Sequence, residues 1–337
     1  MASAAWRVGL AGLLFALTTC PEAMAAYVGD YFFPSTLATT VPTPADFLNP
    51  PNFVRLPTSA ATPSTSEVDV PTTYSKLITP DWSVTATETL RILEQANRTR
   101  AGFDNLLLGT QYQLYTDAEH QFVFTIGGTA TIGGTGSASL GTASANISTG
   151  SPNVGPESPS VVAAPFSTFT PTVYVGKGFG DLPDSMAAFR PIAVTSQVGV
   201  ALPTQSKTFT TVTLPTGATA GIETFNPNIL QWGFALEYSQ VTTSYSDGER
   251  KGSRFAHGWV PLVEFALQTP LEGPLAGTTT GTINPGAVFV TQYFQFAMEA
   301  IIPINERSGR DIGARAQVHL YLSELFPDTI GKPIFDK

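Results

Sequence analysis

The sequence predicts an all-β protein, an antiparallel up-and-down transmembrane β-barrel of about ten strands, within a range of about eight to twelve. Between residues 230 and 239 every second residue is large and apolar, and the residues between them are small or polar. The same alternation returns between residues 312 and 322. A period of two is typical of a strand with one apolar face, and about ten tilted residues match the thickness of a bilayer.

A second observation concerns the chain after Leu17, where no stretch offers the roughly eighteen apolar residues of a membrane-spanning helix. Lipid cannot satisfy the hydrogen bonds of an open sheet edge, so strands that cross a membrane must close into a barrel. The formal net charge of -9 and the lack of a Lys/Arg-rich run argue against nucleic acid as a partner.

Residues 1–25 are expected to be a secretory signal peptide. Arg7 precedes an apolar run at 8–17, and Ala23, Met24 and Ala25 form a small-x-small cleavage pattern. The competing interpretation is a lipoprotein signal at Cys20, which the Leu-Thr-Thr before this cysteine disfavours. Without the signal peptide the chain has no cysteine. We therefore expect neither a disulfide nor a thiolate metal site.

Residues 26–80 form a separate zone in which nine prolines are spread among Thr, Ser and Ala. Because proline removes the donors of a strand ladder, we expect no strand here. The zone is either a periplasmic leader or a plug that tucks into the barrel, and the sequence leaves both open.

The barrel is expected to occupy residues 81–326, followed by a C-terminal tail at 327–337. Alternation and turn residues predict ten strands with uncertain ends, at 82–92, 103–115, 120–131, 166–177, 190–202, 228–240, 257–269, 281–290, 292–302 and 311–323. The connections at 116–119 and 291–292 are tight, whereas 132–165 and 203–227 are long and polar. With both termini periplasmic, the tight turns lie on the periplasmic side and the long loops outside, as in outer-membrane barrels.

Four aromatic residues test this topology, because all of them fall on the apolar face near the periplasmic ends of their strands. They are Trp82, Tyr112, Tyr238 and Trp259. An aromatic girdle belongs at this level of a membrane, although ordinary strand aromatics are the alternative interpretation.

The polar faces of the strands place a set of side chains in the lumen, namely Gln231, Glu237, Glu264, Gln268, Gln295, Glu299, Arg315, Gln317 and His319. If residues 303–310 connect a hairpin, Glu299 faces Arg315 and Gln295 faces His319. We therefore predict an ion pair between Glu299 and Arg315 inside the barrel. These polar residues either fill a narrow lumen or line a path for a polar or cationic solute, from which the surplus of Glu excludes anions.

Signatures of catalysis are faint. The three histidines form no metal-ligand pattern, and the inward position of His319 does not suit a lipase that works on membrane lipid. Gly176, Gly178 and Gly180 mimic part of a nucleotide-binding pattern, but no apolar helix comes after them, so they indicate a turn. We expect no enzyme activity, no catalytic residue, no metal and no cofactor.

Three segments carry a family resemblance: VYVGKGFGDLPDSMAAFRPIAVTSQVGVALP at 173–203, NPNILQWGFALEYS at 226–239 and TTGTINPGAVF at 279–289. They resemble uncharacterised proteobacterial outer-membrane proteins and are loosely similar to the family named for the MetA pathway of phenol degradation. The resemblance implies an outer-membrane barrel linked to uptake of aromatic or other small compounds, and it supplies no catalytic residues. Many such barrels end on an aromatic residue that the barrel-assembly machinery reads, for which Phe326 and Phe335 are both candidates.

The first functional hypothesis is a monomeric passive channel for small molecules in the outer membrane. Its lumen charges are Glu237, Glu264, Glu299 and Arg315, and the long loops gate its outer mouth. The second is a structural or surface-interaction barrel with a plugged lumen and functional extracellular loops. A third, a secreted soluble sandwich, would need a second sheet over the apolar row at 230–236.

Overall fold

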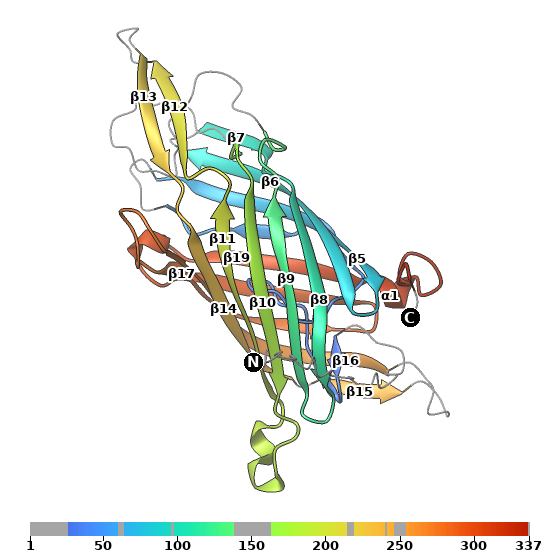
Figure 1. The fold of residues 1–337 in the computed structure, drawn as a ribbon. Helices are drawn as coiled ribbons and strands as arrows, with labels where there is room; N and C mark the ends of the chain where they lie inside the picture. Colours follow the sequence, from blue (N-terminus) through green and yellow to red (C-terminus); the bar gives the residue numbers. More distant parts are fainter. Residues whose placement is uncertain are drawn as a thin grey trace, which may run out of the picture.

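The computed structural model describes residues 26–59, 64–95, 98–137, 163–213, 219–239, 241–245 and 254–335. The expected signal peptide and most of the loop at 132–165 lie outside these residues. The described chain forms a closed antiparallel barrel of twelve strands (Figure 1). Within the described residues, no helix is long and apolar enough to cross a membrane.

Neighbouring barrel strands are hydrogen-bonded almost entirely in chain order. The first position holds two short strands, β3 (Phe47–Asn49) and β4 (Phe53–Arg55), which both pair with β5 and with β19. The others are, in order, β5 (Ser66–Thr79), β6 (Trp82–Gln95), β8 (Leu107–Asp117), β9 (Phe122–Thr131), β10 (Thr168–Gly178), β11 (Ile192–Pro203), β14 (Ile229–Tyr238), β16 (Arg254–Pro270), β17 (Thr280–Val290), β18 (Phe294–Pro303) and β19 (Gly313–Tyr321).

All ten strands expected from alternation are present, within a few residues of their expected bounds, but the barrel has twelve strands, the upper limit of the expected range of eight to twelve. The two additional barrel positions come from residues 47–55 and 66–79. The expectation that residues 26–80 contain no strand is therefore wrong, and the barrel begins well before residue 81.

The prolines of this region lie where the ladder needs no donor. Pro50 and Pro51 form the break between β3 and β4. The carbonyl of Pro71 in β5 accepts from the Asn52 N–H at 3.0 Å, so Pro71 faces the same break. In an antiparallel ladder the N–H and C=O of a residue point to one neighbour. An N–H at position 71 would therefore point at the break between β3 and β4, where the ladder offers it no partner.

The two ends of the barrel differ. The end that holds the connections 80–81, 118–121, 179–191, 239–253 and 291–293 is called the turn end here, and the opposite end the loop end. At the loop end a hairpin of β12 (Lys207–Thr213) and β13 (Thr219–Phe225) extends beyond the wall, and β7 (Arg98–Phe103) extends from β6 (Figure 1). The tight connections lie together at the turn end and the long ones at 132–165 and 203–227 lie at the loop end, which confirms the expected grouping. The two added strands do not change it, because an even number of strands before residue 81 leaves every later connection at the same end.

The 239–253 connection is the long exception at the turn end, and β15 (Thr242–Tyr245) pairs there with the start of β16. The turn between β10 and β11 contains the short 3-10 helix η2 (Asp184–Phe189). After β19 the chain forms α1 (Leu322–Leu325), and its tail folds back on β5, where the Phe335 N–H donates to the Ile78 carbonyl at 2.9 Å. Phe326 and Phe335 are both exposed.

Apolar side chains cover much of the outer face of the wall. Trp82, Tyr112, Tyr238 and Trp259 are 40% to 50% exposed, and they lie toward the turn end. Val198, near the middle of β11, is 47% exposed beside Trp232 of β14. The alternation in the sequence thus corresponds to an apolar exterior and a polar interior.

The closure between β19 and the first strand position rests on few ladder pairs. In the described ladder five residue pairs join β3 and β4 to β19, and five join them to β5. Side chains replace part of the missing ladder, because Asn52 Oδ1 accepts from the Val318 N–H at 2.9 Å and Asn49 Oδ1 lies 2.8 Å from His319 Nδ1.

Asp311, just before β19, secures this closure at the loop end. Its carboxylate accepts from the N–H and hydroxyl of Thr58 and forms a 3.3 Å ion pair with Arg55. Above all, the backbone hydrogen bond from Thr58 holds the pKa of Asp311 below its ordinary value.

A pH-dependent loss of stability should therefore involve Asp311. Because its folded pKa is depressed, its contribution is complete above the unfolded value of about 3.9 and is lost as the pH falls through the folded value. We expect Asp311→Asn to lower the free energy of unfolding at pH 7 and the difference from wild type to shrink below about pH 4. Denaturant titrations at both pH values measure this, and an equal difference at both would contradict it.

Candidate functional site: the barrel lumen and its N-terminal plug

Residues 26–46, called the plug here, lie inside the barrel. The plug starts at the turn end, where the Tyr31 hydroxyl donates to the Pro191 carbonyl at 3.2 Å. It reaches the middle of the wall at Thr40, whose N–H donates to Gln197 Oε1 at 3.0 Å. It returns to the turn end at Asp46, which accepts from the Lys76 ammonium and the Leu77 N–H at 2.8 Å. Residues 26–46 are thus placed as a plug, whereas residues 47–55 and 66–79 of the zone at 26–80 belong to the wall.

Apolar side chains seal the plug against the turn-end half of the wall. The plug begins with the hairpin of β1 (Tyr27–Val28) and β2 (Tyr31–Phe32). Phe32 packs among Val260, Leu262, Val288 and Val290. On the other side Phe33, which is fully buried, packs with Val28, Tyr31, Val123 and Ala193. The lumen is thus filled by apolar contacts at this end.

Glu264 of β16 is the most heavily engaged lumen residue. It is fully buried. Its carboxylate accepts from the N–H groups of Leu37, Ala38 and Thr39 at 2.7, 3.0 and 2.6 Å. The Thr39 hydroxyl adds a fourth hydrogen bond of 2.6 Å. Three successive N–H groups that converge on one anion form a concave anion site, called a nest.

Gln295 of β18, two strands away from Glu264, also holds the plug. Its amide bonds the Ser35 backbone twice, accepting from the N–H at 3.2 Å and donating to the carbonyl at 2.8 Å. The Tyr321 hydroxyl also donates to Gln295 Oε1 at 2.8 Å. The amide is therefore fixed in orientation by the wall and bound to the plug.

His319 lies opposite Gln295 in the β18–β19 ladder, as the hairpin register predicts. It does not contact the plug through a hydrogen bond among the described residues. Its ring instead packs on Phe47 and Tyr321, and Nδ1 is placed by Asn49. The structure therefore gives His319 a place in the closure of the barrel.

Glu299 and Arg315 are also opposite each other, which confirms the predicted register. Their charged groups are 4.0 Å apart, at the limit of an ion pair. Among the described residues no donor is hydrogen-bonded to the oxygens of Glu299, and Arg315 Nε and Nη1 have no acceptor. The ion pair exists, but it leaves much of the hydrogen-bonding capacity of both groups unused.

Glu237 of β14 points into the lumen near Tyr31, and Thr195 donates to its Oε1 at 3.3 Å. Its Oε2 has no hydrogen-bond partner within the described chain. Glu237 and Glu299 both interact electrostatically with Glu264. The structure thus brings Glu237, Glu264, Glu299 and Arg315 into one charged cluster.

Several wall residues that bind the plug are missing from the sequence-based set of lumen residues, and three of them lie on β8, β9 and β11. Gln197 binds Thr40, Gln111 Nε2 donates to the Val41 carbonyl at 3.0 Å, and Thr125 donates to the Pro42 carbonyl. Each alternates with outward apolar neighbours on its strand, such as Val198 beside Gln197. That alternation is the signal that could have identified them.

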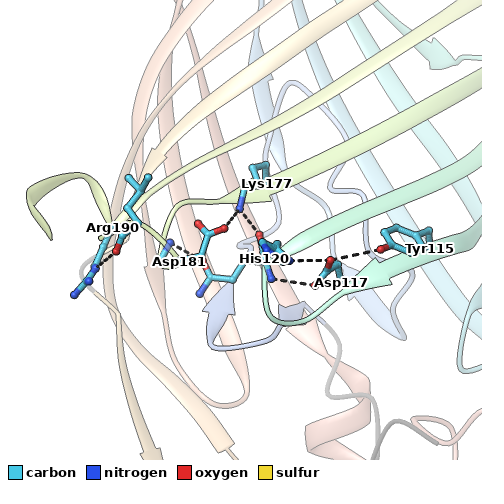
Figure 2. Close-up of polar contacts among 9 residues, drawn as sticks. Tyr115, Asp117, His120, Lys177, Asp181 and Arg190 are labelled. Carbon is cyan, nitrogen blue, oxygen red and sulfur yellow. Dashed lines mark hydrogen bonds and ion pairs between the residues drawn. The ribbon is translucent and has the colours of Figure 1, made fainter. Parts of the chain in front are cut away.

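Two turns beside the entrance of the plug carry a polar network, shown in Figure 2. Asp117 accepts from the His120 N–H at 3.0 Å, and Lys177 forms a 2.7 Å ion pair with Asp181 (Figure 2). These hydrogen bonds lower the pKa values of Asp117 and Asp181. The partners come from the same turn or from adjacent turns, so the network stabilises the turn end of the barrel. Its side chains do not converge on one point, as catalytic groups would.

The glycines of the 176–180 segment form close contacts in this region. A Cβ at Gly178 would lie 2.9 Å from the Tyr31 ring, and one at Gly180 would clash with Gln121 Nε2. The Gly180 N–H donates to Gln121 Oε1 at 2.8 Å. The glycines thus belong to a strand end and turn that pack closely on the plug and on the neighbouring turn.

In the described part of the chain, no group of three or more His, Cys, Asp or Glu side chains is placed to hold a metal ion. No protein-family model and no curated protein sequence matches the chain. The resemblance to outer-membrane barrels of the phenol-degradation type therefore stays an expectation from sequence.

Proposed function

We propose that this protein is an outer-membrane channel for small molecules whose lumen is closed by its own plug until the plug moves. The observation that carries the proposal is the combination of a closed barrel with a polar lumen and a plug held there by hydrogen bonds and apolar packing. The contacts of the plug are non-covalent, so they can break and re-form while the hydrogen-bonded ladder of the wall stays closed.

The outer surface supports a membrane location. The outward side chains of the wall include Leu108, Ile126, Val173, Val198 and Leu236, all about 39% to 47% exposed. An apolar band with aromatic residues toward one rim is the surface of an outer-membrane barrel. A signal peptide at 1–25, the barrel-assembly machinery and outer-membrane lipid as partners, and a monomeric state belong to the same proposal.

The hydrogen bonding of the lumen supports a removable plug over a permanent one. Glu264 and Gln295 are satisfied by the plug, but Glu299, Arg315, Asn284 and Gln317 retain buried polar atoms without partners among the described residues. Such groups are costly when they are shielded from water. Departure of the plug would hydrate them, which offsets part of the cost of breaking its contacts.

The second candidate is a structural or surface-interaction barrel. It is favoured by the occupied lumen and by the β12–β13 hairpin, which projects past the loop end and carries Phe209, 75% exposed. In that case the plug never leaves, and the loop end performs the function.

Reconstitution of the full chain into planar bilayers separates the two candidates. We expect brief openings in folded, inserted protein, and liposome swelling with small solutes that falls as solute size increases. Complete absence of current and swelling, in protein shown to be folded and inserted, would contradict the channel and favour the plugged barrel.

A further inference from the structure

Three glutamates meet near the innermost part of the plug. Glu237 is opposite Leu262, two residues from Glu264 on the same inner face, and Glu299 is opposite Gly286, two residues from the Asn284 that faces Glu264. All three glutamates are at most 4% exposed. Arg315 pairs with Glu299, whereas neither Glu237 nor Glu264 forms an ion pair within the described chain. Three acidic side chains against one guanidinium favour a further positive group in this place.

An unpartnered amide is aimed at the same place. Asn284 of β17 is opposite Glu264 in the ladder, so both side chains share the inner face. Asn284 is fully buried, and neither its Oδ1 nor its Nδ2 has a hydrogen-bond partner among the described residues. Together with Glu237 Oε2, which also lacks a partner there, it gives the cluster acceptors that the plug does not use.

The plug itself indicates what this cluster binds. It offers Glu264 three N–H groups and one hydroxyl at 2.6 to 3.0 Å. An ammonium group offers three N–H donors on one atom and also a full positive charge. It would therefore replace the hydrogen bonds of the nest and bring a full positive charge to Glu264, which the neutral plug backbone does not.

We propose that Glu264, with Glu237 and Glu299, forms a binding site for small organic ammonium ions, and that such a solute opens the channel by replacing the plug on Glu264. The inference rests on the proposed channel function and names its solute class. The plug and the solute compete for one carboxylate, so binding of one weakens binding of the other.

The test measures single-channel open probability of the full chain while a solute is titrated. The probe is 1,4-diaminobutane, and 1,4-butanediol and succinate are its neutral and anionic analogues of the same chain length. We expect the diamine to raise the open probability by about 5- to 150-fold, the range of ordinary coupling between two ligands. The diol and succinate should leave it unchanged.

Two variants locate the effect. Glu264→Gln keeps the size of the side chain but removes its charge, so we expect more frequent openings without solute and no response to the diamine. Glu237 makes no hydrogen bond to the plug among the described contacts, so we expect Glu237→Gln to weaken the response to the diamine. Glu119→Gln, exposed in the β8–β9 turn, is the matched control and should change neither.

The outcomes separate this inference from the proposed function. If the open probability does not change with the diamine, or if Glu264→Gln responds as strongly as wild type, the ammonium site is overturned but the channel function is not. Absence of current in every variant overturns the channel and the site with it. If Glu264→Gln fails to fold, the reversal potential in a KCl gradient decides, because cation preference should be reduced in Glu237→Gln. An anion-selective wild type, or an unchanged preference, overturns the site.

Discussion

Val198→Arg is expected to lower the free energy of unfolding in lipid vesicles by about 2–4 kcal/mol, the cost of an arginine on the lipid face of a barrel near the bilayer midplane. Val198 suits this test because it lies near the middle of β11, points outward and is 47% exposed. On a water-exposed wall the same substitution would change stability by about 0.5 kcal/mol or less. Denaturant titration of vesicle-reconstituted protein measures the difference.

The matched control is Phe209→Arg. Phe209 is also an exposed apolar residue, at 75%, but it lies on the β12–β13 hairpin beyond the wall. We expect it to tolerate arginine with almost no loss of stability. Equal effects at the two positions would contradict a wall embedded in lipid.

Phe33→Ala is expected to release the plug. Phe33 is fully buried between the plug and the wall, with its ring 4.9 Å from that of Tyr31. Truncation of a buried phenylalanine typically costs about 3–5 kcal/mol. Since every 1.4 kcal/mol is a factor of about ten, the open state should gain about a hundredfold or more in population. The barrel ladder contains no residue of β1 or β2, so the wall should stay folded.

Two measurements detect the release of the plug in Phe33→Ala. Single-channel recording should show a much higher open probability, and a protease added at the turn end should cut within residues 26–46 much faster than in wild type. Phe335→Ala is the control, because Phe335 is an exposed phenylalanine in the C-terminal tail. Unchanged opening and unchanged cleavage in Phe33→Ala would show that these contacts do not hold the plug.

The ten strands after residue 80 could be predicted because their inward and outward residues differ in character along each strand. The register of β18 and β19 could be predicted from the short connection between them, which places Glu299 opposite Arg315. Where alternation is strong, both the strands and the pairing of their side chains can therefore be predicted from the sequence.

The strands before residue 80 could not be predicted because prolines outweigh a weaker alternation. In β5 the outward Tyr74 is 40% exposed, whereas its neighbour Ser75 is fully buried, so the pattern is present. Proline argues against a strand only where its missing N–H should enter a ladder. The break at Pro50 and Pro51 removes that requirement, and a break in the partner strand is not visible in a local pattern.

Docking of the plug could not be predicted for a different reason. Glu264 binds the backbone N–H groups of residues 37–39, and every residue other than proline carries such a group. Local sequence therefore does not reveal the pairing. Gln295 likewise binds the plug through the backbone of Ser35 and not through its side chain. The lumen side chains were identifiable, but their partner was not.

A reversible crosslink between plug and wall tests the central claim most directly. In a Cys20→Ser background the chain carries no native cysteine, and Ser35→Cys with Gln295→Cys places two thiols where the plug and β18 are hydrogen-bonded. A short thiol crosslinker should abolish single-channel openings, and reduction should restore them. Ser35→Cys alone should be insensitive to both treatments. Openings that persist unchanged in fully crosslinked protein would contradict a channel closed by its own N-terminal segment.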